Sequence, residues 1–180
     1  MSVPPEFVET GLLARFDSRV DRAVARVPRS LRPVMWVATA IGYPGVQTVP
    51  LVVVALLTSG PTRVASAVLA VSLALPRVLK HLIGRRRPQS EYVAAMRMAG
   101  PSFPSGHAYC AVAATGFYAF LAVTRASAPW PVLAVVATVV WILWVSLSRL
   151  FFRAHFASDV VGGWVIGATV LGTVLAVTQP

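Results

Sequence analysis

The sequence predicts an all-α integral membrane protein, a helical bundle of five to six transmembrane helices with an N-terminal interfacial amphipathic helix. Hydrophobic residues make up 57% of the 180 residues and charged residues only 12%. The mean hydropathy is +0.72, far outside the balance of a soluble domain of this size. Long apolar stretches bounded by Pro, Gly or Arg follow one another along the chain. Because each membrane helix takes about 20 residues, we expect a single domain over 1–180.

The first expected element is the amphipathic helix, within residues 1–29. From about Pro5 to Arg29, apolar residues recur near the helical period and arginines stand between them. A helix of this kind lies along a membrane surface. The first residues show no basic region followed by an apolar core, so we expect no cleavable signal peptide.

The helical bundle is expected within 30–180. Two shorter apolar segments, roughly 31–42 and 45–59, are separated by the cluster Gly42-Tyr43-Pro44-Gly45, which must interrupt a helix. Four longer stretches are expected to span the membrane, at roughly 62–83, 106–124, 130–152 and 158–178. The one sizeable polar segment, Gly84 to Pro104, lies between the first two of them.

The charge of the chain indicates its partners. The formal net charge is +10, but the arginines alternate with apolar runs and form no polar basic face. We therefore expect membrane lipids and a lipid phosphate as partners, and no nucleic acid. The single cysteine, Cys110, lies in an apolar stretch, so neither a disulfide framework nor a thiolate metal site is expected. The oligomeric state stays open, with a homodimer as one arrangement.

The polar residues of the bundle are expected at one membrane face. If each of the four long stretches crosses once, the ends of the first and third and the starts of the second and fourth share a side. The shared face collects Lys80, Arg87, Ser105, His107, Arg149, His155 and Asp159. Charged groups at membrane depth cost several kcal/mol unless they are paired or serve a site. We therefore expect a functional site there.

Two histidines and one aspartate have the spacing for nucleophilic catalysis. His155 and Asp159 are four residues apart, so on a helix the carboxylate can hold the imidazole at Nδ1 and leave Nε2 free to attack phosphorus. His107, on the other side of a bound phosphate, would act as general acid to the leaving oxygen.

The basic residues fit a phosphate. Lys80 supplies a point charge, and Arg87 and Arg149 supply planar forks for its oxygens. Ser105 and Gly106 open a helix, so the hydroxyl, the free N–H groups and the helix dipole can also face the anion. Phosphoryl transfer depends mostly on such electrostatic positioning.

These residues resemble the type 2 phosphatidic acid phosphatase superfamily, which includes membrane lipid phosphatases, bacterial acid phosphatases and vanadium haloperoxidases. Its three motifs occur in order: Lys80, six residues, Arg87-Pro88; Pro104-Ser105-Gly106-His107; and Ser148-Arg149, five residues, His155, three residues, Asp159. The resemblance covers about half the chain and implies that His155 becomes phosphorylated, Asp159 orients it and His107 protonates the leaving group. It also implies that Lys80, Arg87, Ser105, Gly106 and Arg149 bind phosphate and that no metal or other cofactor is needed.

Other basic residues have plainer interpretations. Arg85 and Arg86 are expected to be juxtamembrane anchors. His81 falls outside the motif and should point away from the site. Arg153 is expected to extend to the membrane interface.

The resulting hypothesis is a metal-independent membrane lipid phosphatase that hydrolyses a phosphomonoester or pyrophosphate. A polyprenyl pyrophosphate or polyprenyl-linked phosphate is favoured, as in undecaprenyl pyrophosphate phosphatases of the cell-wall lipid carrier; phosphatidylglycerol phosphate and phosphatidic acid are the alternatives. Two rival functions stay open. One is a phosphotransferase that uses the same phosphohistidine, and the other is a non-catalytic lipid-phosphate binding or transport protein.

The expected location is a bacterial cell membrane with the active site on the extracytoplasmic side. If the 31–42 segment crosses the bilayer, the arginine-rich N-terminus lies opposite the site and in the cytoplasm. If that segment is re-entrant, the N-terminus and the site share a side.

Overall fold

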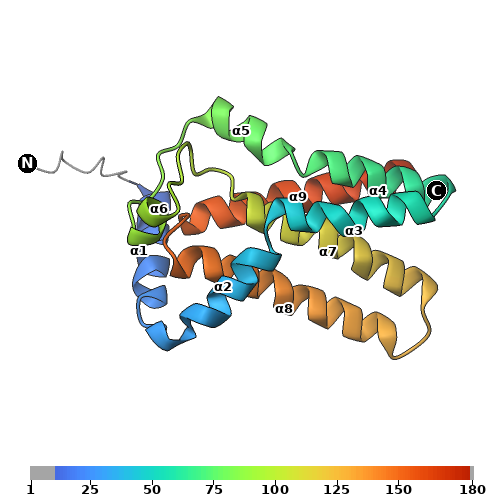
Figure 1. Ribbon diagram of the computed structural model, residues 1–180, viewed down its shortest axis with the longest axis horizontal. Helices are drawn as coiled ribbons and strands as arrows, with labels where there is room; N and C mark the ends of the chain where they lie inside the picture. The colour runs from blue at the N-terminus through green and yellow to red at the C-terminus, as the bar shows by residue number, and fades with distance from the viewer. Residues whose placement is uncertain (1–10, 179–180) are drawn as a thin grey trace, which may run out of the picture.

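The computed structural model describes residues 11–178, and all regular structure within them is helical (Figure 1). The elements are α1 (Leu12–Val24), a 3-10 turn η1 (Arg29–Leu31), α2 (Arg32–Ile41), α3 (Pro44–Leu57), α4 (Gly60–Ser72), α5 (Leu75–Ile83), α6 (Glu91–Ala95), α7 (Gly106–Arg125), α8 (Trp130–Phe151) and α9 (Ala157–Thr178). The predicted all-α class is confirmed. The part of the predicted N-terminal helix that precedes residue 11 lies outside the described residues.

Within the residues that the structure describes, four helical segments are long and apolar enough to cross a membrane: Gly60–Ile83, Gly106–Arg125, Trp130–Phe151 and Ala157–Thr178. They coincide with the four predicted spans. Arg29–Ile41 and Pro44–Leu57 meet at 45° and provide a fifth if they form one broken span. The chain is therefore an integral membrane helical bundle, with four or five candidate spans in residues 11–178 where five to six were expected.

Two breaks divide the apolar segments, and each has a proline just after it. At the predicted Gly/Pro cluster, α2 ends before Gly42 and α3 begins at Pro44. The break between α4 and α5, at Leu73 and Ala74, was not expected. Pro76 in the first turn of α5 explains it, because proline has no N–H to donate to the carbonyl one turn back.

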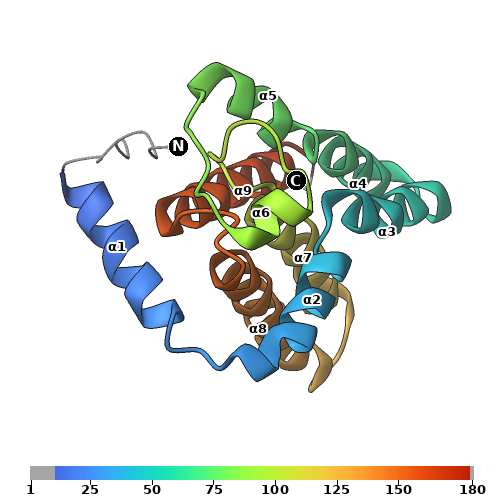
Figure 2. The same cartoon turned by 60° about the vertical axis from the view of Figure 1, so that its left-hand side comes forward.

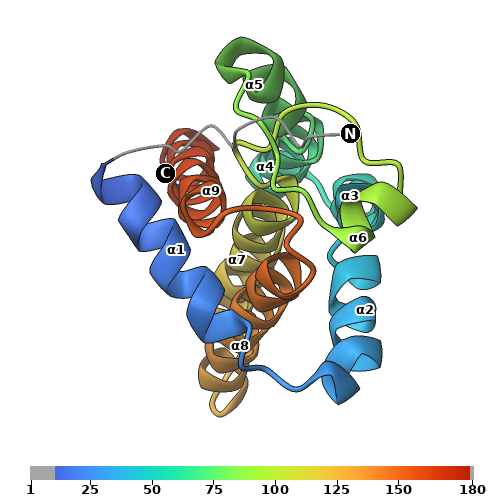
Figure 3. The same ribbon diagram turned by 90° about the vertical axis from the view of Figure 1, so that its left-hand side faces the viewer.

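Helix α7 is the centre of the bundle, with α8 and α9 packed along it (Figure 3). Two glycines of α9 permit a close approach. A Cβ at Gly163 would lie 2.7 Å from the carbonyl oxygen of Ser105, and one at Gly167 would lie 2.8 Å from that of Tyr109. The backbone N–H of Ser105 donates to the carbonyl of Asp159 at 2.9 Å. The start of α9 is thus held directly against the start of α7.

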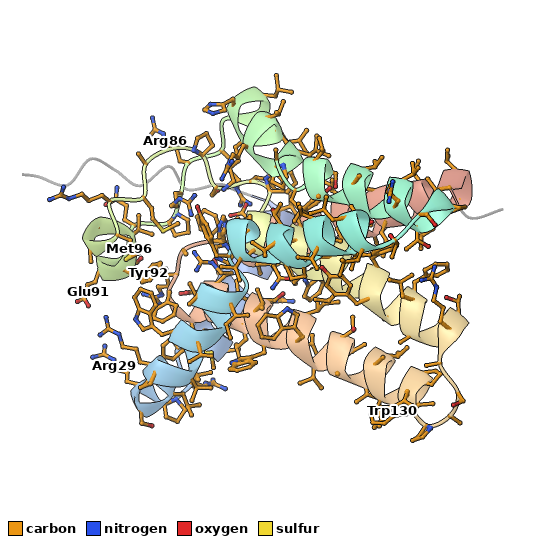
Figure 4. All side chains as sticks on the ribbon, turned by 45° about the vertical axis from the view of Figure 1, so that its right-hand side comes forward. Arg29, Arg86, Glu91, Tyr92, Met96 and Trp130 are labelled. Atoms are coloured by element: carbon orange, nitrogen blue, oxygen red, sulfur yellow. The ribbon has the colours of Figure 1, made fainter. Side chains whose placement is uncertain are left out.

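The long helices run between two ends of the molecule, with Trp130 at one end and Glu91, Tyr92 and Met96 at the other (Figure 4). We call the second one the site end: it holds the ends of α5 and α8 and the starts of α7 and α9. The topology expected from the sequence is therefore correct. Between the two ends the helices expose apolar side chains, including Val52, Leu56, Val68, Val136 and Val165, as a lipid-facing surface requires.

Helix α1 lies across the site end, beside α8 and α9 (Figures 2 and 3). It exposes Leu12, Leu13 and Phe16, as an interfacial helix does, and it buries Asp17 against Ser158 at the start of α9. The arginine-rich α1 therefore shares a side with the predicted site. The alternative that placed the N-terminal helix opposite the site is wrong, because Asp17 of α1 contacts Ser158 at the start of α9.

Candidate active site

All the predicted site residues lie at the site end. They come from α5 (Lys80), the α5–α6 connection (Arg87), the start of α7 (Ser105, Gly106, His107), the end of α8 (Arg149), the α8–α9 connection (His155) and the first turn of α9 (Asp159). Ser105, Arg149 and Asp159 are fully buried, and His155 is only 4% exposed. The helix termini converge because the spans alternate in direction and α7 and α9 pack closely.

His155 and Asp159 stand together where α9 begins. Oδ2 of Asp159 accepts the N–H of Phe156 at 3.0 Å, which caps the helix. The same oxygen lies 3.4 Å from Nδ1 of His155, longer than the usual 2.7–3.2 Å of a well-formed N–H···O bond. At this separation the carboxylate acts on the ring mainly through its charge. Nε2 lies 3.4 Å from Nη1 of Arg87, so the other nitrogen faces the cations.

The environment keeps the His155 ring neutral. Burial lowers the pKa of His155 well below its usual value, and the positive charges of Arg149, Lys80 and Arg87 lower it further. A neutral imidazole has one nitrogen with a free lone pair. With the proton on Nδ1, beside Asp159, the lone pair is on Nε2. That is the protonation state a nucleophilic histidine needs.

Two of the cations are held by carbonyl oxygens. Nζ of Lys80 donates to the carbonyls of Pro101 and Ser102 at 3.3 and 3.4 Å. Arg87 donates through Nη1 to the carbonyl of Ala154 at 2.7 Å and through Nη2 to that of Pro101 at 3.2 Å. Burial lowers the pKa of Arg87, and the charge of Arg149 lowers it further. Carbonyl oxygens fix these side chains without cancelling their charge.

Arg149 is held in a similar way. Its Nη1 donates to the hydroxyl of Thr39 at 3.1 Å and lies 3.5 Å from the hydroxyl of Tyr92, whose ring faces the guanidinium at 5.5 Å. Within residues 11–178, Nε and Nη2 of Arg149 and Nε of Arg87 are buried without a hydrogen-bond partner. Buried donors are nearly always satisfied, so these N–H groups fit an anion that completes the site.

The segment 104–107 opens a helix, as predicted. Ser105 is the N-cap of α7, and its Oγ accepts the N–H of Ala108 at 3.4 Å. A Cβ at Gly106 would meet Pro76 and Pro44 at 3.7 and 3.8 Å, which is ordinary contact, so packing alone does not demand glycine there. Close approach of an anion to the backbone is a sufficient reason.

His107 is tied to the carbonyl of Thr39, with Nε2 at 3.2 Å. Because a carbonyl can only accept, Nε2 carries the proton in this pairing. Thr39 thus contacts both His107 and Arg149. It lies on α2, outside every motif, and sequence reasoning missed it together with Tyr92; a lone threonine in an apolar segment gave no signal.

Arg85 is not a surface anchor, and this corrects the sequence interpretation. Its Nη1 donates to Oδ1 of Asp159 at 2.7 Å and to Oγ of Ser158 at 2.6 Å. Its Nη2 donates to Oδ2 of Asp17 at 2.9 Å. Unlike Arg87, it is paired with two carboxylates. The one available signal was Asp17 itself, an acid within an arginine-rich helix.

Two other expectations concern neighbouring basic residues. Arg153 does not simply extend to the interface: Nε and Nη2 hold both oxygens of Asp21 on α1, at 2.8 and 2.7 Å. His81 is exposed while Lys80 beside it is half-buried, so it points away from the site as expected.

The arrangement combines a neutral imidazole, three partly uncompensated cations and a helix N-terminus. Such a pocket attracts a tetrahedral oxyanion and offers it a nucleophile. In the described part of the chain, no three His, Cys, Asp or Glu side chains are grouped closely enough to hold a metal ion.

The fold and these residues define an integral membrane helical protein with a buried cationic pocket at one membrane face. A family model of the PAP2 superfamily matches residues 62–180. The chain belongs to this superfamily.

A solved structure shares the fold. The crystal structure of a transmembrane PAP2-type phosphatidylglycerolphosphate phosphatase from Bacillus subtilis superimposes with a TM-score of 0.78 and 23% sequence identity, covering 94% of this chain and 88% of that one. No curated protein matches the chain.

Proposed function

We propose that the chain hydrolyses a phosphomonoester or pyrophosphate of a membrane lipid through a phosphohistidine at His155. The observation that carries the proposal is the pocket itself: a neutral imidazole whose Nε2 faces cations held by uncharged oxygens. These cations keep their charge for the substrate. Asp159 supports the ring as it becomes cationic during attack.

The reaction has two steps. Nε2 of His155 attacks phosphorus, the P–O bond to the lipid breaks, and the leaving oxygen takes a proton from His107. Water then attacks the phosphohistidine; its proton returns to His107, the P–N bond breaks and inorganic phosphate leaves. In the first step the N–H of His107 must exchange the carbonyl of Thr39 for the leaving oxygen. Lys80, Arg87, Arg149, Ser105 and Gly106 bind the phosphate oxygens throughout.

The test is phosphate release by the purified protein in detergent. His155→Ala should abolish hydrolysis, whereas His81→Ala, which removes an exposed histidine one residue from Lys80, should retain it. Turnover by folded His155→Ala protein would exclude the proposed nucleophile.

Two rival functions are separated by the same assay. A phosphotransferase would pass the phosphoryl group to an added alcohol in preference to water, which product analysis detects. A non-catalytic lipid-phosphate binder would show affinity without turnover; it would need the cations but has no use for a His155–Asp159 pair.

The substrate is proposed to be a polyprenyl pyrophosphate or polyprenyl-linked phosphate, on the basis of the short chain and its small polar loop. Phosphatidylglycerol phosphate is the main alternative, since it is the substrate named for the Bacillus subtilis protein. Phosphatidic acid is the third. A panel of these lipids at equal surface concentration, compared by kcat/KM, decides between them.

The site is proposed to face the extracytoplasmic side of a bacterial cell membrane. The placement of α1 removes one argument for this orientation, because its arginines lie at the site end and the positive-inside rule would place them in the cytoplasm. The remaining argument is the resemblance to membrane phosphatases whose sites face outward. Labelling of introduced cysteines in intact cells tests it.

A further inference from the structure

Helix α1 is joined to the bundle by two carboxylates of different character. Asp17 is buried, at 6% exposure; its Oδ1 accepts the N–H of Ser158 at 2.8 Å, and its Oδ2 accepts the Ser158 hydroxyl at 2.7 Å. Asp21, one turn later, pairs with Arg153 in the open, each side chain about half exposed. Ion pairs in the open contribute little, so Asp17 is the stronger connection.

The buried connection continues to the proposed nucleophile. Oδ2 of Asp17 also accepts Nη2 of Arg85 at 2.9 Å, and Nη1 of the same guanidinium donates to Oδ1 of Asp159 at 2.7 Å. Oδ2 of Asp159 faces His155. A carboxylate on the N-terminal helix and the carboxylate beside the nucleophile therefore share one arginine.

Apolar packing against the bundle is weak at the start of α1. Leu12 and Leu13 are 85% and 65% exposed. A cavity of about 580 Å³, lined by Leu13 and Phe16 of α1 and by Ile83, Phe103 and Val161 of the bundle, opens beside Arg85. The polar contacts of Asp17 therefore hold this part of α1 against the start of α9.

We propose that Asp17 is a positioning residue of the active site, acting through Arg85 on Asp159. This inference rests on the proposed function. Arg85 lies between two carboxylates, so each takes part of its charge. Without Asp17, the guanidinium would lose one of its carboxylate partners and interact more strongly with Asp159. It would then draw the charge of Asp159 away from the ring of His155, which becomes cationic on attacking phosphorus. Formation of the phosphohistidine should slow, while the phosphate-binding cations are untouched.

The experiment compares Asp17→Asn with Asp21→Asn in the full chain. Both replace an α1 carboxylate by an amide of the same shape, but only Asp17 reaches Arg85. We expect Asp17→Asn to lower kcat on the order of tenfold, the size of effect seen when a residue that orients a functional group is removed. KM should be nearly unchanged. Asp21→Asn should match the wild type. Asp17→Glu should restore part of kcat, because it returns the charge.

A double-mutant cycle tests the route. If Asp17 acts through Arg85, Asp17→Asn should lower kcat by a much smaller factor in an Arg85→Gln background than in the wild type. An equal fall in kcat in both backgrounds, or equal kcat for Asp17→Asn and Asp21→Asn, would overturn the proposal.

Folding and function are controlled separately. If Asp17→Asn does not fold, Ser158→Ala removes the hydroxyl shared by Asp17 and Arg85 and should lower kcat in the same direction by a smaller factor; an unchanged kcat there counts against the proposal. Hydrolysis by the wild type and its loss in His155→Ala together support the proposed phosphatase. If the Asp17 variants then do not show the expected fall in kcat, only the positioning role of Asp17 is rejected.

Discussion

Replacing Thr39 by valine tests whether α2 belongs to the active site. Valine has nearly the shape of threonine and differs by the loss of the hydroxyl. That hydroxyl is the 3.1 Å acceptor for Nη1 of Arg149 and lies 2.9 Å from the hydroxyl of Ser148. The backbone carbonyl that contacts His107 stays in place. The substitution therefore acts on Arg149 and leaves His107 alone.

The size of the effect follows from the burial of Arg149, which is fully inaccessible. A hydrogen bond to a charged group contributes about 1.5–3 kcal/mol. If that free energy orients the guanidinium for the phosphate, its loss lowers kcat/KM by roughly 10- to 150-fold, since each 1.4 kcal/mol is tenfold. The contact to Tyr92 at 3.5 Å is too long to replace it.

The measurement is kcat/KM for a lipid phosphate in detergent, with two controls. Thr39→Ser restores the hydroxyl and should recover most of the activity. Thr169→Val removes an exposed hydroxyl that bonds only within α9, to the carbonyl of Val165, and should have no effect. A Thr39→Val enzyme within twofold of the wild type would refute the role assigned to Thr39.

Three further predictions follow from the site and its surroundings. In the unfolded chain His155 takes up a proton near pH 6.5, whereas the lowered pKa keeps the ring neutral in the folded protein. The free energy of unfolding should therefore fall as the pH drops below about 6.5, by up to about 1.4 kcal/mol per pH unit. Thermal unfolding in detergent at pH 7.5 and 5.5 should show a larger loss for the wild type than for His155→Gln, and equal losses would contradict the buried neutral ring. Chelation by EDTA should leave phosphate release unchanged, and full loss of activity would exclude the metal-free mechanism. In intact cells an impermeant maleimide should label Glu91→Cys and not Ser127→Cys, which lies in the connection at the opposite end; the reverse pattern would place the site in the cytoplasm.

The sequence predicted the positions of the long helices because each is a nearly continuous apolar stretch closed by Pro, Gly or Arg. It did not predict the break before α5. Pro76 stands inside an otherwise apolar run, and a proline at that place fits both a kinked span and a new helix. It also did not decide on which side of the membrane α1 lies, because the short α2 segment is compatible both with a transmembrane helix and with a re-entrant segment.

The grouping of the site residues was predicted from topology, since alternating spans force Lys80, His107, Arg149 and Asp159 to one face. The partners of those residues could not be predicted. Lys80 and Arg87 bond to carbonyls of the 101–102 segment and of Ala154, and backbone acceptors leave no trace in side-chain patterns. Asp17 reaches Ser158 across 141 positions, a contact that depends on how α1 docks.

Arg85 and Arg87 show why a run of arginines cannot be divided by sequence alone. The two side chains are two residues apart, yet Arg85 lies between the carboxylates of Asp17 and Asp159, whereas Arg87 is held by two carbonyls. A guanidinium paired with two carboxylates has no charge left for a substrate. One held by neutral oxygens in a buried site carries a desolvated charge whose cost only an anion can offset. The distinction between a structural and a phosphate-binding arginine therefore lies in the charge of its acceptors, which only the folded chain defines.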